Sequence, residues 1–300
     1  MMAWSKITSR IFFQNSQNFA KFLIHRNIRR PKSSSSKFKE DLIYINSQKI
    51  NYLKVGEGPK NIVCFPGTLG TIWTDFQPQI ENLNKEEFTV YVWEPPGHGK
   101  STPHDRVYTS KYLQEDADMG YEFIKAIGLK SFSLLGWSGG GNAGMIFAAK
   151  YKNIIDKMVL WGCCSYLTKE DIDRYEITQD IDNWSEKIKA PLLKIYGEEA
   201  LREIQNSTFQ ANVDILYEGG DIAATLLKYI ECPTLILHGA KDPLVSPKHA
   251  QYLHENIKGS RLHIFPDGKH NIHLRYANEF NEIVTKFLLD EDQVKKLMEN

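Results

Sequence analysis

The stretch Gly136-Trp137-Ser138-Gly139-Gly140 decides the fold through what precedes and follows it. Residues 132–135 (Phe-Ser-Leu-Leu) are short and mostly apolar, as in a buried parallel strand. Residues 141–149 are small or apolar, which is typical of a helix packed closely on a sheet. A Gly-x-Ser-x-Gly pattern at such a strand-to-helix turn is typical of a strained turn that exposes a nucleophilic serine. The pattern alone is weak, with about 0.1 chance matches in 300 residues, so its flanks and downstream partners carry the interpretation.

Strand-like and helix-like segments alternate on both sides of this stretch, from Asp41 onward. The expected strands are residues 42–45, 50–55, 61–65, 88–93, 132–135, 157–161, 234–237 and 261–265. The first two are joined through Ser47-Gln48 as a hairpin, and a helix is expected over residues 111–127. Repeated alternation predicts an α/β fold with a mostly parallel, eight-stranded sheet covered by helices on both faces.

One segment interrupts the alternation between Gly162 and Cys232. It has helical patterning, several aromatic residues and no clear buried strand. We expect residues 164–231 to form a helical lid inserted after the sixth strand, over the carboxyl edge of the sheet, where it would exclude water and select substrate. The core would then comprise residues 40–163 and 232–290.

An acid that could serve Ser138 stands directly after a predicted strand. A serine nucleophile needs a histidine to take its proton and an acid to orient that histidine. Where the serine lies in such a strand-to-helix turn, the chain order is serine, then acid, then histidine. Asp242 follows the strand at 234–237, which places its carboxylate at the carboxyl edge of the sheet. The alternative is an Asx turn or a helix cap before Pro243. The serine turn upstream favours an orienting role for Asp242.

The expected base is His270, in the loop that follows the strand at 261–265 and 28 residues beyond Asp242. From that loop its imidazole could reach Ser138. His273 is the main competitor, although we expect it to begin the final helix. The other candidates are expected in the core, on a helix and inside a strand: His238, His254 and His263.

Two backbone N–H groups must meet the negative oxygen that develops when a serine attacks a carbonyl. One belongs to the residue after the nucleophile, Gly139, and the other to the loop after the third strand. That loop is residues 66–70, Pro-Gly-Thr-Leu-Gly, which offers the amide of Thr68 or of Leu69. The alternative is an ordinary glycine turn, but the position directly after a buried strand favours the oxyanion role.

Basic residues are concentrated at the amino terminus. Residues 1–39 hold nine Lys or Arg and no Asp or Glu, with many serines and no continuous apolar core. This composition is typical of a mitochondrial transit peptide, and the alternative is a disordered basic tail on a cytoplasmic protein. The remaining chain has 28 basic and 37 acidic residues, which argues against nucleic acid as a partner. No run of about 20 apolar residues predicts a membrane span.

The four cysteines indicate neither a metal site nor disulfides. Cys64, Cys163, Cys164 and Cys232 form no Cys-x-x-Cys pair, and two lie in strand-like runs. Buried free thiols in a reducing compartment are the expected state. We therefore predict an activity that needs no cofactor and no metal.

Several motifs together resemble one known family. They are residues 66–70 (PGTLG), 136–138 (GWS), 238–245 (HGAKDPLV), 258–263 (KGSRLH) and 268–275 (GKHNIHLR). They are similar to the valacyclovir hydrolase, or biphenyl-hydrolase-like, family of the α/β-hydrolase superfamily, over about residues 41–289. The resemblance implies a capped α/β-hydrolase fold, a mitochondrial location and hydrolysis of α-amino acid esters. It also implies that Ser138, Asp242 and His270 match the catalytic triad of the family.

The sequence departs from this family at Gly139. The family usually carries Asp there, and its carboxylate binds the α-amino group of the substrate. The backbone amide of residue 139 is unaffected by the change. The buried ammonium of a substrate, however, would lose a few kcal/mol of binding free energy without its charged partner. An acid of the predicted lid (Glu170, Asp171, Asp173 or Glu176) could supply the missing charge. At residues 94–96 the chain has Glu-Pro-Pro where the family tends to have Asp-Pro-Arg, and we assign no role to this difference.

These features predict a monomeric serine hydrolase that cleaves small carboxylic esters through an acyl-enzyme on Ser138. The same triad could instead serve a carbon–carbon bond hydrolase or a thioesterase, or the fold could be a non-catalytic binding protein. Epoxide hydrolase or dehalogenase chemistry is disfavoured, because those sites have a carboxylate at the serine position.

Overall fold

One sheet of eight strands runs through the computed structural model, which describes residues 38–290. The strand order is β1-β2-β4-β3-β5-β6-β7-β8. The strands are β1 (Glu40–Ile45), β2 (Gln48–Val55), β3 (Lys60–Phe65), β4 (Phe88–Trp93), β5 (Phe132–Trp137), β6 (Ile155–Trp161), β7 (Thr234–Gly239) and β8 (Arg261–Phe265). Only the pairings of β2, with β1 and with β4, are antiparallel, so the predicted mostly parallel sheet is confirmed.

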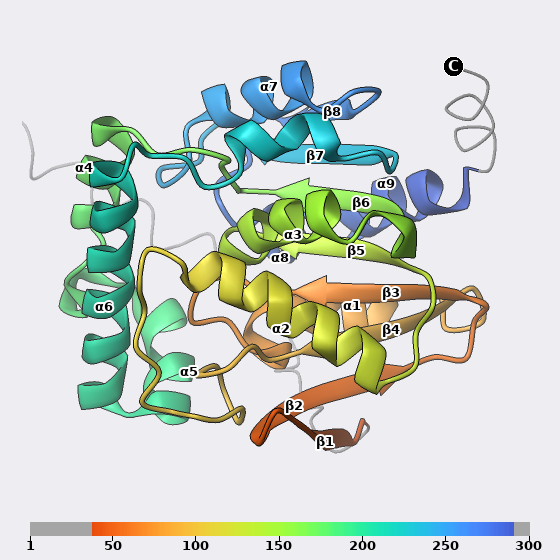
Figure 1. Cartoon of the computed structure of the whole chain (residues 1–300), viewed down its shortest axis with the longest axis horizontal. Helices are drawn as coiled ribbons and strands as arrows, with labels where there is room; N and C mark the ends of the chain where they lie inside the picture. Colours follow the sequence, from red (N-terminus) through yellow and green to blue (C-terminus); the bar gives the residue numbers. More distant parts are fainter. Residues whose placement is uncertain (1–37, 291–300) are drawn as a thin grey trace, which may run out of the picture. The chain divides into compact units, whose positions relative to one another are not determined.

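Helices connect these strands (Figure 1). They are α1 (Ile72–Asn82), α2 (Tyr112–Ala126), α3 (Gly139–Lys150), α4 (Lys169–Glu176), α5 (Glu186–Tyr196), α6 (Glu198–Tyr217), α7 (Pro247–Asn256), α8 (Ile272–Arg275) and α9 (Ala277–Leu289). Short 3₁₀ turns add η1 (Lys152–Ile154), η2 (Ile181–Asn183) and η3 (Ala224–Tyr229). The predicted transit peptide lies outside the described residues except for its last two positions.

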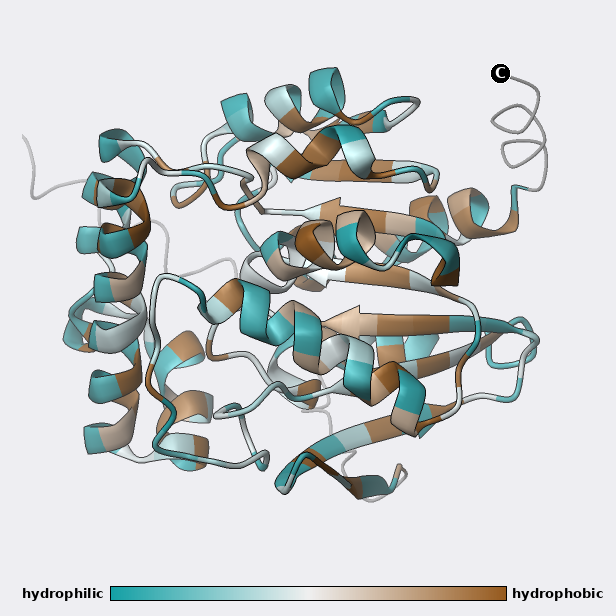
Figure 2. Cartoon of the chain, viewed as in Figure 1, coloured by the Kyte–Doolittle hydropathy of each residue, from teal (hydrophilic) through white to brown (hydrophobic). Residues whose placement is uncertain are grey.

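Apolar side chains cover both faces of the sheet. Residues of α2, α3 and α7 form one buried cluster, in which Phe65 packs edge-on against Trp93 and Phe147. Residues of α1 and α9 form the other, where Trp161 contacts Phe76 and Phe280. Figure 2 shows the central strands mainly brown and the outward turns of the helices teal. The central parallel strands β3 to β7 are therefore buried on both faces, as their nearly continuous apolar sequences require, whereas the edge strand β8 is only partly buried.

Strand boundaries differ slightly from those expected. The predicted hairpin turn at Ser47-Gln48 is wrong by one residue, because Asn46 and Ser47 form the turn and Gln48 begins β2. Asn46 and Ser47 have φ of 48° and 67°, the left-handed pair that suits a two-residue hairpin. β7 also continues beyond Leu237 to Gly239, so the loop that carries Asp242 is shorter than its sequence suggests.

Residues 164–231, called here the helical segment, connect β6 to β7 and contain α4, η2, α5, α6 and η3. Figure 1 shows α4, α5 and α6 on the side toward which the arrows of β3, β5 and β6 point. The two ends of the segment meet, because Leu167 N donates to Gly220 O (2.7 Å) and Ile222 N donates to Ser165 O (3.0 Å). Within residues 38–290, no helix has the length and apolar character needed to cross a membrane.

Candidate active site

Ser138 lies in a strained turn between β5 and α3. Its φ is 52° and its ψ is −122°, a conformation that costs about 1–3 kcal/mol and needs support from the surroundings. Ser138 N donates to Trp161 O at 3.0 Å, which ties the turn to β6. The flanking glycines are required by crowding: a Cβ on Gly136 would lie 2.8 Å from the Cα of Gly141, and one on Gly140 would lie 2.2 Å from the carbonyl oxygen of Phe65.

The structure brings Ser138, His270 and Asp242 together, although they come from three separate loops. Ser138 Oγ lies 3.1 Å from His270 Nε2, and His270 Nδ1 lies 2.8 Å from Asp242 Oδ2. These distances assign the Nδ1 proton of neutral His270 to the Asp242 bond, which leaves Nε2 free to accept the serine proton. The His270 side chain is 14% exposed and that of Asp242 is fully buried, so the carboxylate end of the chain of hydrogen bonds is closed to solvent.

Asp242 is held by the backbone of its own loop. Its Oδ1 accepts from Leu244 N (2.9 Å) and Val245 N (3.1 Å), while Oδ2 accepts from His270. The Asx turn that the sequence offered as an alternative is thus present together with the contact to His270. Burial alone would raise the pKa of Asp242, but the charge and hydrogen bond of His270 outweigh it and lower the pKa. The carboxylate is therefore ionised at neutral pH and can stabilise a protonated imidazole.

The competing histidines are engaged elsewhere. His273 lies in α8, where its Nδ1 accepts from Trp161 Nε1 at 2.9 Å, and burial lowers its pKa to about 3. His238 is buried and donates from Nε2 to Val245 O at 3.1 Å. His254 bonds Ser260, and His263 lies inside β8. Of these four, only His238 approaches the Asp242 carboxylate, with Nε2 3.8 Å from Oδ2.

The loop after β3 lies beside the serine turn. Residues 67–70 form a turn closed by Gly70 N donating to Gly67 O at 2.9 Å, and Leu69 has a φ of 65°. A Cβ on Gly139 would lie 3.2 Å from the amide nitrogen of Thr68. The backbone of Thr68 therefore adjoins the residue that follows the nucleophile, and this contact favours Thr68 over Leu69 as the second oxyanion donor.

Two supports of the site were not predicted from the sequence. Asp75 on α1 is buried, and its Oδ2 accepts from Gly67 N at 2.9 Å, which anchors the loop after β3. Trp137 Nε1 donates to His270 O at 3.1 Å, which ties the serine turn to the loop of the base. The signal for Asp75 was an acid next to the apolar positions Ile72 and Phe76 of one helix.

A cavity of about 10 Å³ adjoins Thr68 and Gly139, which is room for about one water molecule. Its lining is mainly apolar and includes Phe65, Pro66, Pro95, Leu113 and Ala143, with Tyr112, His98 and Asp116 among its polar groups. Asp116 is paired with Arg106 at 2.5 Å, and burial nevertheless raises its pKa to about 6. The cavity as it stands has no room for a substrate group larger than a water molecule.

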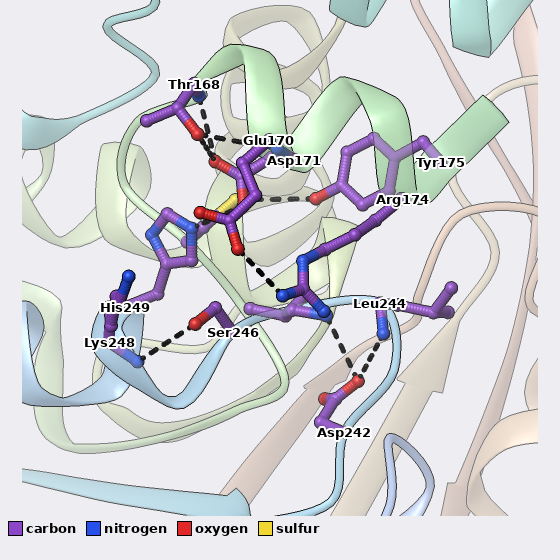
Figure 3. Close-up of polar contacts among 12 residues, drawn as sticks. Thr168, Glu170, Asp171, Arg174, Tyr175, Asp242, Leu244, Ser246, Lys248 and His249 are labelled. Carbon is purple, nitrogen blue, oxygen red and sulfur yellow. Dashed lines mark hydrogen bonds and ion pairs between the residues drawn. The ribbon is translucent and has the colours of Figure 1, made fainter. Parts of the chain in front are cut away.

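Three of the four acids proposed to replace the missing anionic anchor have other partners, and Figure 3 shows two of them, Glu170 and Asp171. Glu170 pairs with Arg174 at 2.9 Å, Asp171 with His249 at 2.8 Å, and Asp173 with Lys169 at 2.7 Å. Glu176 borders a groove of about 310 Å³ with Arg202 and other polar residues.

The cysteines are free thiols, as predicted. Cys64, Cys163 and Cys164 are buried and Cys232 is partly buried. Burial raises the pKa of Cys164 and of Cys232 to about 12, which suppresses thiolate formation at neutral pH. Within residues 38–290, no group of three or more His, Cys, Asp or Glu side chains is arranged to hold a metal ion.

Comparison with known proteins gives consistent matches. Residues 60–195 match the α/β hydrolase fold family, and residues 192–275 match the serine aminopeptidase S33 family. The serine hydrolase BPHL of Mus musculus is 44% identical over 82% of this chain and 85% of its own length, and that of Homo sapiens is 43% identical over the same shares. A solved serine hydrolase involved in carbazole degradation (CarC enzyme) superposes with a TM-score of 0.69 at 21% identity, covering 84% of this chain and 98% of its own.

Fold and site together define a serine hydrolase of the α/β-hydrolase fold. The chain belongs to the family of the serine hydrolase BPHL, the biphenyl-hydrolase-like or valacyclovir hydrolase family. The resemblance predicted from the motifs is confirmed over most of the described residues.

Proposed function

We propose that this serine hydrolase cleaves carboxylic esters through an acyl-enzyme on Ser138. The observation that carries the proposal is the chain of hydrogen bonds from Ser138 through His270 to Asp242, at 3.1 and 2.8 Å. Its open end lies beside the amides of Gly139 and Thr68, where a carbonyl oxygen can be received. The helical segment acts as a lid over this end.

The reaction proceeds in two halves. Ser138 Oγ attacks the ester carbonyl while His270 Nε2 takes the serine proton. The carbonyl electrons move to its oxygen, which accepts hydrogen bonds from the amides of Gly139 and Thr68. The C–O bond to the alcohol then breaks, and His270 returns the proton to the leaving alcohol. Water repeats these steps on the acyl-enzyme and releases the acid, while Asp242 keeps His270 in the required tautomer.

The replacement Ser138→Ala tests the nucleophile. We expect hydrolysis of p-nitrophenyl esters and covalent labelling by a fluorophosphonate both to be lost. Labelling retained in the variant would refute Ser138 as nucleophile. A wild-type protein that neither labels nor gives a burst of p-nitrophenol would instead indicate a non-catalytic binding protein. Turnover of thioesters or of carbon–carbon substrates in place of esters would favour the alternatives on the same triad.

The substrate class follows from the family and from its departure at Gly139. We propose that α-amino acid esters are accepted with a weak preference for the amino group, because Gly139 offers no carboxylate to an ammonium. The measurement compares kcat/KM for a valyl ester and its des-amino analogue. A strong preference for the amino ester would contradict the proposal.

The variant Gly139→Asp sharpens this test. A Cβ at this position would lie 2.6 Å from Thr68 Oγ1, so the threonine hydroxyl must rotate away. Once it does, the new carboxylate should raise the preference for the amino ester by about 10-fold or more, as expected for one charge-assisted hydrogen bond. Gly139→Asn is the matched control, since it adds similar bulk without the charge.

We also propose that residues 1–39 direct the chain to mitochondria, on the strength of their basic, acid-free composition. A fluorescent reporter fused behind these residues should enter mitochondria. The same fusion with its Arg and Lys residues changed to Gln should stay in the cytoplasm. A reporter that remains cytoplasmic with the natural leader would support the alternative of a basic tail.

A further inference from the structure

One residue of the helical segment reaches a loop of the active site. Tyr196 is the last residue of α5, and its hydroxyl donates to Leu69 O at 3.0 Å. The same hydroxyl accepts from Gly99 N at 2.9 Å. Burial raises the pKa of Tyr196 well above its ordinary value, so the hydroxyl stays protonated and keeps its donor role.

Leu69 needs support of this kind. Its φ of 65° lies in the left-handed region, which costs about 1–2 kcal/mol for an ordinary residue. Leucine has no polar side chain to offset that conformation locally, so contacts from elsewhere must hold it. Among residues 38–290, Leu69 and Ser138 are two of the four non-glycine residues with positive φ, and both belong to the active site.

The other contacts of this turn come from the core. Asp75 accepts from Gly67 N at 2.9 Å, and His98 Nδ1 lies 3.1 Å from Gly70 O. The contact to the carbonyl of Leu69 comes instead from the helical segment. The loop after β3 is therefore bound at both ends by the core, and in its middle the Thr68 side chain bonds Tyr112 of α2 while the Leu69 carbonyl accepts from Tyr196.

We propose that Tyr196 is a positioning residue, through which the conformation of the loop after β3 depends on the docking of the helical segment. With the segment docked, Tyr196 holds the Leu69 carbonyl and thereby keeps the neighbouring Thr68 amide beside Gly139. When the segment moves away, the turn relaxes and the developing oxyanion loses a donor. This inference rests on the proposed ester hydrolysis, and Tyr196 itself touches neither the ester nor the triad.

The test is Tyr196→Phe, which removes both hydrogen bonds and keeps the ring. We expect kcat for a p-nitrophenyl ester to fall by about 10-fold, less than the loss of a direct oxyanion donor, with KM changed by less than about 3-fold. A trifluoromethyl ketone, which forms a tetrahedral adduct with the serine, should bind weaker by a similar factor. The product acid should bind as in the wild type.

The matched control is Tyr217→Phe, because Tyr217 belongs to the same segment and is 85% exposed. Its kinetic constants should not change. Thermal unfolding of each variant reports whether it is folded at the assay temperature. A purely structural role for Tyr196 would lower the unfolding midpoint but leave the kcat and the ketone affinity of the folded enzyme unchanged, and that result overturns the inference.

A second variant covers the case in which Tyr196→Phe does not fold. Tyr196→Gln retains a donor and an acceptor near Leu69 O and Gly99 N, and it should keep more of the ketone affinity than Tyr196→Leu. Equal affinities in these two variants also overturn the inference. Failure of the proposed function is distinguishable, because wild-type protein would then neither label with a fluorophosphonate nor turn over the ester.

Discussion

The sheet core and the helical segment contribute to the active site by different physical means. The core supplies Ser138, Asp242 and His270 from loops at strand ends, and apolar burial fixes the sheet to which those strands belong. The segment contacts the core through polar groups, with Tyr196 on the loop after β3, and with α4 on the loop that follows β7 and on the helix α7 beyond it. The sheet core supplies the reacting groups, and the helical segment adds contacts to loops of the active site.

Figure 3 shows how α4 contacts the loop of the catalytic acid. Arg174 donates to Pro243 O at 3.4 Å, next to Asp242, and Asp171 bonds His249 of the following helix α7 at 2.8 Å. The difference between the regions therefore predicts two scales of effect. Changes to core reacting groups should cost orders of magnitude in rate, whereas changes to contacts of the segment should cost about 10-fold or less.

The largest effect is expected for Asp242→Asn, which tests whether the core alone supplies the chemistry. The amide keeps an oxygen for the N–H groups of Leu244 and Val245, but it presents the wrong group to His270 and favours the wrong tautomer. We expect kcat to fall by about 10⁴-fold with little loss of stability, as in other triads. Asp267→Asn is the control, because Asp267 is exposed and pairs with Lys241. A loss of kcat below 10-fold in Asp242→Asn would contradict the claim that the sheet core supplies the reacting groups.

A change in the pH dependence of folding stability is expected for Asp75→Asn. Asp75 is the core residue that anchors the loop after β3. Burial raises the pKa of Asp75 to about 7, against about 4 in an unfolded chain. Between these values the folded protein binds one more proton than the unfolded protein, so this group lowers stability as the pH rises from 4 to 7.

Urea unfolding at pH 5 and pH 8 measures this contribution. The stability lost between these pH values should be smaller in Asp75→Asn than in the wild type by a few kcal/mol, which is the order of a shift of this size. The exposed Asp105→Asn should behave as the wild type. An unchanged pH dependence in Asp75→Asn would show that the carboxyl is not protonated in the folded protein.

The smallest effect on turnover is expected for His249→Gln, which weakens the attachment of α4. Burial would raise the pKa of Asp171, but hydrogen bonds from His249 and Thr168 outweigh it and lower the pKa. A lowered pKa stabilises the fold above the ordinary value near 4, and this stabilisation is lost as the pH falls through and below it. His249→Gln should lessen that acid sensitivity, raise KM by about 2–3-fold and leave kcat nearly unchanged.

Amide hydrogen exchange locates the effect of this variant. Protection should fall in α4 and stay constant in β5 and β6. A fall in kcat as large as that of Asp242→Asn would mean that the segment takes part in the chemistry, and the distinction between the two regions would fail.

The sequence predicts the sheet and the positions of its reacting groups because both depend on local patterns. Short apolar runs locate the strands, and a polar residue directly after a strand must lie at the sheet edge. This logic places Ser138, Asp242 and His270 in positions that the structure brings together.

The supports escape prediction because they depend on how distant elements dock. Tyr196 and Leu69 are 127 positions apart, and no local pattern relates them. The choice between the Thr68 and Leu69 amides likewise depends on the close approach of Gly139.

The crowding between Gly139 and Thr68 constrains how this enzyme can acquire a new specificity. A side chain at position 139 that could bind a charged group of the substrate must first displace the hydroxyl of Thr68. The backbone amide of the same Thr68 also lies beside position 139. The two positions are therefore coupled, and the order of substitution matters. We expect Thr68→Ala to cost a hydrogen bond with Tyr112, and we expect Gly139→Asp to be tolerated better in that background than in the natural one.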